Sequence, residues 1–489
     1  MLKSVRFFPL CALAVVLILI GQVAVFGQSR TNSSQGESAK NSSAKSKKRK
    51  KKKTSSASFI VLGSPNQPAS VVEVPAAAKF EAPVSQPATP SIRAEKSSGI
   101  SISPKGVVPN GAVPTGNIII SEFRVRGPNG ANDEYVELYN AGGSDHTVSG
   151  GGTGYAVAAS DGVARCIIPN GTVIPNRGHY LCVNSVGYSL ASYAAGNGTT
   201  ATGDATYTTD IPDNAGIAIF STSVAVDFTL ANRLDAVGST SEANTNYKEG
   251  TGYPALTPFS INYSFYRDLC GKSGSITTFG PCTLTGPKDT NNNAADFVFV
   301  DTNGTSAGAG QRLGSPGPEN LSAPIERNAS VAVTALDVCV AAASPPNRVR
   351  DFASDPANNS TFGTLDIRRT LTNNTGGNVT RLRFRIIDIT TFPAPSGIAD
   401  LRPRTSTDLV VTVDRPPCGS GTSNVTVRGT TLEEPPSQPN GGGFNTSMSA
   451  PTVTLATPLA NGATIDLRLL LGIQQTGNFK IYFNAELLP

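Results

Sequence analysis

Six of the seven cysteines lie beyond the N-terminal apolar segment, and their thiols are the groups of this chain best suited to covalent chemistry. Their spacing favours three local disulfides, although six cysteines allow other pairings as well. The favoured pairs are Cys166 with Cys182, Cys270 with Cys282, and Cys339 with Cys418. A structural zinc site is disfavoured because the chain has no Cys-x-x-Cys pair.

Only two histidines, His146 and His179, could supply an imidazole for acid–base or metal chemistry. Cys166 and Cys182 bracket His179, so a Cys–His nucleophile is one interpretation of this segment. An oxidised structural pair beside a histidine is the favoured alternative in an exported chain. The chain carries no G-x-S-x-G elbow, H-E-x-x-H helix or P-loop, and we predict a non-enzymatic protein without a small-molecule substrate.

Asp289, Asn291 and Asn293 have the 1, 3, 5 spacing of an EF-hand-type calcium loop. Ala294 occupies the sixth position, where such loops need glycine, and two of the three ligands are neutral. The pattern therefore predicts weak Ca²⁺ binding or, as the favoured alternative, an Asx-rich turn. No other cofactor is expected.

Two groups of basic residues are candidates for binding an anionic surface or a polyanion. The first is a run in the N-terminal part of the chain: Lys47, Lys48, Arg49, Lys50, Lys51, Lys52 and Lys53. The second is an alternating row: Arg381, Arg383 and Arg385. The run is an electrostatic tether or a solvated spacer; a nuclear localisation signal fits the residues but conflicts with a signal peptide. The row is either a phosphate-binding stripe or a soluble sheet face paired with acids.

The N-terminal region predicts export. Residues 1–27 resemble a secretory signal, with Lys3 and Arg6 before an apolar run and small residues near Gly27. An uncleaved membrane anchor is the alternative. Residues 28–116 are rich in Lys, Ser, Pro and Ala and predict a disordered linker, because they cannot bury enough apolar surface to offset chain entropy. The first 60 residues have 12 basic residues and one acidic residue, a net charge of +11 against +5 for the whole chain, so the remainder is mildly acidic.

Beyond residue 116 the chain predicts an all-β protein. It has 49 Gly, 35 Pro and no Trp, which argues against a helical bundle. Short apolar segments are separated by Gly, Asn, Pro and Ser turns, as in antiparallel sandwiches. The predicted strands are 117–126, 133–140, 155–159, 163–168, 178–183, 215–220 and 224–230. A second alternating region contains Leu382, Phe384 and Ile386, with a change of phase at Ile387 that indicates a β-bulge. We expect one β-sandwich over 117–320 and a second antiparallel β-sandwich over 326–489.

The first region resembles the lamin-tail domain, a compact immunoglobulin-like β-sandwich. The resemblance is carried by Ile118 to Glu122, the run Asp133-Glu-Tyr-Val-Glu-Leu-Tyr-Asn140, and later motifs near residues 168–181, 234–238, 289–297 and 314–320. Segments 184–212 and 240–285 depart from it as insertions. The resemblance implies a tethering unit, as in secreted bacterial members of the family.

Together these features predict an exported interaction or tethering protein of the cell envelope or extracellular space. The polybasic linker would bind an anionic surface, and the sandwich loops would bind a protein or envelope component. The alternatives are a secreted hydrolase or nuclease accessory protein and a self-associating surface protein.

Overall fold

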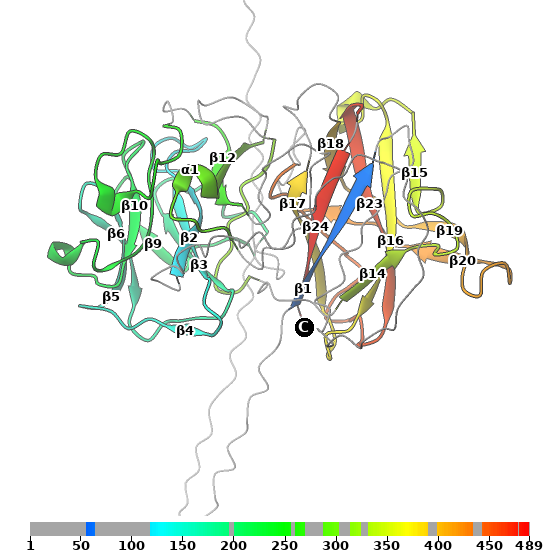
Figure 1. Cartoon of the computed structure of the whole chain (residues 1–489), viewed down its shortest axis with the longest axis horizontal. Helices are drawn as coiled ribbons and strands as arrows, with labels where there is room; N and C mark the ends of the chain where they lie inside the picture. Colours follow the sequence, from blue (N-terminus) through cyan, green and yellow to red (C-terminus); the bar gives the residue numbers. More distant parts are fainter. Residues whose placement is uncertain are drawn as a thin grey trace, which may run out of the picture. The chain divides into compact units, whose positions relative to one another are not determined.

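A computed structural model describes residues 55–63, 118–194, 200–255, 260–268, 287–302, 313–323, 331–389, 399–433, 443–477 and 479–488. All of them belong to one compact unit, Lys52–Pro489. These residues are nearly all β-strand and turn (Figure 1), as the sequence predicts. The α-helix of the described part is the single turn α1, Asn293–Asp296.

The first pair of sheets is built from residues 118–301. The larger sheet has the order β13-β12-β2-β3-β8-β9, with bounds Phe297–Asp301, Tyr263–Arg267, Ile118–Arg124, Tyr135–Asn140, His179–Asn184 and Ala205–Tyr207. The smaller sheet has the order β11-β10-β5-β6, with bounds Arg233–Val237, Ile217–Phe220, Gly154–Ala159 and Ala164–Pro169. Neighbouring strands are antiparallel except β8 and β9, which are parallel. A short ladder joins β4, His146–Thr147, to β7, Val173–Ile174.

Both of these sheets contribute to one hydrophobic core, as in a β-sandwich. Ile120 and Val136 enter it from the larger sheet, and Val157 and Ile219 enter it from the smaller. A β-bulge in β2 lies between Ile120 and Glu122, so the alternation of inward and outward side chains changes phase there.

The second pair of sheets draws most of its strands from residues 331–488. One sheet has the order β1-β24-β17-β22-β21, with bounds Ser55–Gly63, Phe479–Leu488, Arg381–Ile389, Ser447–Ser449 and Thr431–Leu432. The other has the order β14-β16-β23-β18, and β15 also pairs with β16. The bounds of these five are Val331–Ala335, Thr364–Asn373, Thr464–Gln475, Asp400–Arg404 and Arg348–Asp351. A separate hairpin joins β19, Leu409–Asp414, to β20, Thr422–Val427.

The alternation predicted for this second region is confirmed. Leu382, Phe384 and Ile386 of β17 and alternate residues of β24 are buried in a second core. The register of β17 against β24 shifts after Ile386, which is the predicted bulge. This core also includes Val300 of β13. The expected boundary near residues 320–326 stays a prediction.

Two segments differ from the sequence prediction. Residues 55–63, inside the predicted linker, form β1, which pairs antiparallel with β24 (Figure 1). The consecutive apolar residues Phe59 to Leu62 give this segment the β-propensity that the surrounding composition hides. Residues 224–230, predicted as a strand, instead form a turn containing the 3-10 helix η1, Ala225–Asp227, because their alternating apolar residues mostly face solvent.

Among the residues that the structure describes, no helix is long and apolar enough to cross a membrane.

Candidate functional site

Arg383 and Arg385 of β17 lie in the interior, where their exposed fractions are 0% and 6%. Arg383 pairs across the sheet with Glu486 of β24, and its Nη1 is 3.2 Å from Glu486 Oε2. Glu319 Oε1 accepts from Arg383 Nη1 and from Arg385 Nη2, both at 2.8 Å. We use the name arginine–glutamate cluster for these four side chains together with His179, which is described below: Arg383, Arg385, Glu319, Glu486 and His179.

This burial corrects the phosphate-binding stripe predicted over Arg381, Arg383 and Arg385. Arg381 is the most exposed of the three, with a side chain 28% exposed, and it pairs with Glu433. A polymer phosphate has no access to the two buried guanidinium groups. Pairing with acids was the alternative interpretation, and the structure supplies those acids inside the protein.

The opposite wall of the cluster comes from the outer face of the larger sheet. The bulge in β2 places Glu122 across from Glu137 of β3, and both are buried. Glu122 Oε1 accepts from the Gly317 amide at 2.9 Å, and Glu137 Oε2 accepts from the Glu319 amide at 2.6 Å. The segment 317–319 therefore delivers the Glu319 side chain to the arginines.

His179, at the start of β8, also faces this cluster. Its Nε2 lies 3.3 Å from Glu319 Oε2 and 3.9 Å from Glu137 Oε1. Burial lowers the pKa of His179, and the nearby arginines lower it further, although Glu319 opposes them. The histidine is therefore mostly neutral at pH 7.

The carboxyl groups of this region divide into two kinds. Burial alone raises the pKa of Glu319, but Arg385, His179 and Arg383 lower it to about 2. Burial raises the pKa of Glu137 well above its usual range, and the charges of Glu122 and Glu319 raise it further. Glu319 is thus the stable anion, while Glu137 is the group that holds a proton.

A cavity of about 50 Å³ lies beside Glu137, His179, Glu319 and Arg385. Pockets that take drug-sized ligands occupy roughly 300–1,000 Å³. Since one water needs about 10–15 Å³ of such space, the cavity has room for a few waters. The space is too small for a polymer or sugar.

Two of the three predicted disulfides are confirmed. Cys166 of β6 is bonded to Cys182 of β8, which joins the smaller sheet to the larger through the core. This bond also removes the Cys–His nucleophile considered for His179. Cys339 is bonded to Cys418, across 79 residues of chain.

Other predicted features fall outside the described residues. They are the signal segment 1–27, the cysteines Cys270 and Cys282, and the basic residues Lys47, Lys48, Arg49, Lys50, Lys51, Lys52 and Lys53. Their assignments stay predictions. The two described disulfides suit an oxidising environment.

The calcium-loop pattern does not gather its three side chains around one point. Asn293 instead accepts the amides of Gly238 and Glu249 through Oδ1, at 2.9 Å each, and donates to the Ala236 carbonyl at 2.8 Å. Only Asp289 of the pattern turns toward other acids.

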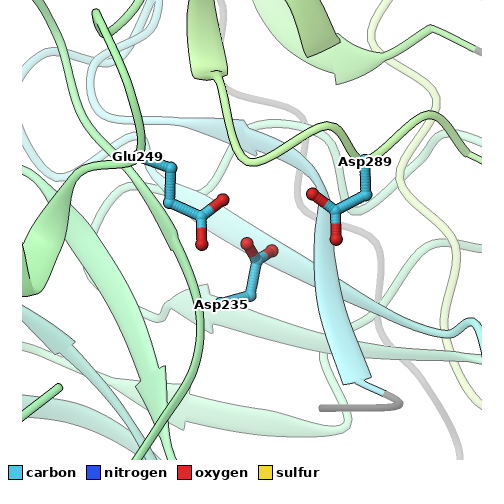
Figure 2. A group of neighbouring side chains, drawn as sticks. All are labelled: Asp235, Glu249 and Asp289. Atoms are coloured by element: carbon cyan, nitrogen blue, oxygen red, sulfur yellow. The ribbon is translucent and has the colours of Figure 1, made fainter. Parts of the chain in front are cut away.

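Asp289 meets Asp235 of β11 and Glu249 of the loop after η2, Thr245–Tyr247. One carboxylate oxygen of each lies within 4.8 Å of the others, and the three side chains point toward one another (Figure 2). We call this group the acidic triad. Burial raises the pKa of Glu249 to about 9, with the charges of Asp235 and Asp289 adding to the effect. Its members are far apart in sequence, and only Asp289 belongs to a pattern that predicts cation binding.

A third feature is an exposed apolar turn between β10 and β11. Val226 is 86% exposed and Leu230 is 55% exposed. Between them Phe228 is buried, with its ring stacked on Phe220 at a centroid distance of 4.7 Å. Asn232 Nδ2 also donates to the Asp227 carbonyl at 2.9 Å. The turn is thus held in place by Phe228 and Asn232, while Val226 and Leu230 present aliphatic groups to solvent.

Comparison with known proteins gives no family assignment. No family model matches the chain, and a search of curated proteins finds no match. A solved structure of a DUF4876 family protein from Bacteroides thetaiotaomicron aligns with a TM-score of 0.25 and 15% sequence identity, over 37% of this chain and 70% of that one.

Proposed function

We propose that this chain is an exported, non-enzymatic interaction protein of the cell envelope or extracellular space. The basic run 47–53 acts as an electrostatic tether to an anionic surface, and the sandwich loops bind a protein or envelope component. The lamin-tail resemblance over residues 117–320 supports a tethering role. The Cys166–Cys182 and Cys339–Cys418 bonds support an oxidising location.

The observation that carries the proposal is the anchored apolar turn at residues 224–230. Single exposed apolar side chains are ordinary, but Val226 and Leu230 stand on one turn whose conformation is fixed by the burial of Phe228. A loop that is already ordered loses less conformational entropy when a partner binds. This arrangement favours a loop that binds a protein partner over a loop whose apolar groups only pack within the fold.

The tether is tested with the full chain and a variant in which every Lys and Arg of 47–53 is replaced by Gln. Both are titrated with phosphatidylglycerol–phosphatidylcholine vesicles at rising salt. We expect the wild type to bind and to weaken steeply with salt, because each basic residue near an anionic surface contributes about 1 kcal/mol. Equal binding by the two proteins would remove the tether from the proposal.

The turn is tested by sedimentation with isolated cell envelopes. The double variant Val226→Ser, Leu230→Ser is compared with Val186→Ser, which changes a valine that is 64% exposed elsewhere on the surface. We expect the double variant to lose at least about tenfold in affinity, and the control to lose none. If the double variant binds as well as wild type, the turn is not the binding loop.

A further inference from the structure

The three side chains of the acidic triad come from different segments of the chain and meet at one place. Asp235 comes from β11, Glu249 from the loop after η2, and Asp289 from the segment before α1 (Figure 2). Asn293 ties two of these segments together, because its Oδ1 accepts amides from Gly238 and Glu249. We propose that Asp235, Glu249 and Asp289 form a binding site for a hard divalent cation, best fitted to Ca²⁺.

The carboxyl group of Glu249 turns toward Asp235 (Figure 2) and carries a buried, unsatisfied oxygen. Glu249 is 6% exposed, and its Oε2 has no hydrogen-bond partner among the described residues. The other oxygen, Oε1, accepts from Arg233 Nη2 at 3.2 Å. A buried carboxylate oxygen without a partner costs stability, so such a group calls for an ion or water in its place.

Asp235 is held in position by groups that leave it aimed at the triad. Its Oδ2 accepts from the Ile120 amide at 2.6 Å, and its Oδ1 accepts from the Ala236 amide at 2.8 Å. Arg267 Nη2 contacts both oxygens at 2.7 and 2.8 Å, so these contacts use the four lone-pair positions of the carboxylate. A cation therefore binds Asp235 in competition with Arg267 Nη2, which contacts both oxygens and can keep one of them.

The local charge favours a divalent cation over a monovalent one. Four carboxyl groups and two guanidinium groups meet here: Asp235, Glu249, Asp289, Asp296, Arg233 and Arg267. With all of them ionised, the site carries two unbalanced negative charges in a largely buried place. A doubly charged cation balances them.

The ligand chemistry selects among the divalent cations. All three donors are carboxylate oxygens, which suit Ca²⁺ and Mg²⁺ rather than Zn²⁺ or Cu²⁺. The span of up to 4.8 Å between donor oxygens is about twice a Ca²⁺–oxygen distance of 2.3–2.6 Å. Mg²⁺ prefers closer and more regular donors, so we expect it to bind more weakly.

The test uses the full oxidised chain, first treated with a chelator and then titrated calorimetrically with CaCl₂ or MgCl₂. We expect one saturable Ca²⁺ site, with Mg²⁺ at least tenfold weaker. At a Ca²⁺ concentration 100 times Kd, the melting temperature should rise by about 5 °C. No saturable heat with either ion up to 10 mM, taken as roughly the weak end of extracellular Ca²⁺ sites, would overturn the proposal.

Glu249→Gln is the decisive variant, because it keeps the shape of the side chain and removes its charge. We expect it to lose at least tenfold in Ca²⁺ affinity while being as stable as wild type in chelator. Asp227→Asn, which removes an exposed acid on η1, is the control and should bind like wild type. Asp289→Asn serves if Glu249→Gln does not fold, and unchanged Ca²⁺ affinity in the variant used would refute the site.

Discussion

The arginine–glutamate cluster and the acidic triad are both buried groups of charges, yet they are balanced differently. In the cluster, Glu319 receives two guanidinium groups and its pKa falls to about 2. In the triad, Glu249 lies beside two other acids and its pKa rises to about 9. The first arrangement is complete within the chain, while the second requires a proton or an added cation.

The largest expected effect comes from breaking the complete arrangement. Arg383→Met should lower the free energy of unfolding by about 3–5 kcal/mol, because Glu319 and Glu486 lose a buried partner. Urea unfolding at pH 7 measures it. The matched control is Arg381→Met on the same strand, whose side chain is 28% exposed. A loss as small as that of the control would mean that Arg383 is not central to the cluster.

Acid should weaken the cluster through Glu319. Its pKa in the folded protein is about 2, below the ordinary value of 4.5, so its contribution is present above pH 4.5 and is lost as the pH falls toward 2. The size of this contribution is about 3 kcal/mol. Urea unfolding of wild type and Glu319→Gln from pH 6 to pH 2 measures it. The two curves should converge at low pH, and parallel curves would contradict the assignment.

A smaller effect is expected from removing the residue that assembles the triad. Asn293→Ala should cost about 2 kcal/mol, because two buried backbone amides and one carbonyl lose their partner. Thermal unfolding in the presence of a chelator measures this loss of stability without any contribution from cation binding. Asn291→Gly, at an exposed position of the same loop whose φ of 55° glycine adopts without strain, should change stability by less than about 0.5 kcal/mol.

The smallest effect tests an ion pair outside both groups. Arg428 Nη1 lies 2.6 Å from Asp408 Oδ2, and both side chains are more than 40% exposed. Arg428→Met should cost less than about 1 kcal/mol, because water and salt screen an exposed pair. Urea unfolding at low and high salt measures it. A cost near that of Arg383→Met would show that burial is not what separates these arginines.

The strands were predicted from the sequence more accurately than the surroundings of their charged side chains. Sequence analysis predicted β17 and its bulge from the alternation around Phe384 and Ile386, because burial of one face leaves a period of two in the sequence. It misplaced Arg383, because a polar row has the same pattern whether it meets water or buried acids. The acids concerned, Glu319 and Glu486, come from other parts of the chain.

The acidic triad could not be predicted from the sequence, for a related reason. Asp235 and Asp289 occur in motifs that could be described, but nothing in the sequence near Glu249 marks it as their neighbour. Convergence depends on how the loops after η2 and before α1 close on β11, and Asn293 decides that closure. The spacing of Asp289, Asn291 and Asn293 predicted weak Ca²⁺ binding or, as the favoured alternative, an Asx-rich turn. The Asn291 amide does donate to Asp289 Oδ1 at 3.2 Å, as in an Asx turn.

The pairing of β1 with β24 has a consequence for how copies of the chain avoid one another. β24 lies between β1 and β17, so its backbone groups are paired on both sides. A chain lacking residues 55–63 would turn β24 into an edge strand with a free row of amides and carbonyls. Such an edge accepts any extended peptide, including β24 of a second molecule, so the N-terminal strand protects the protein against aggregation.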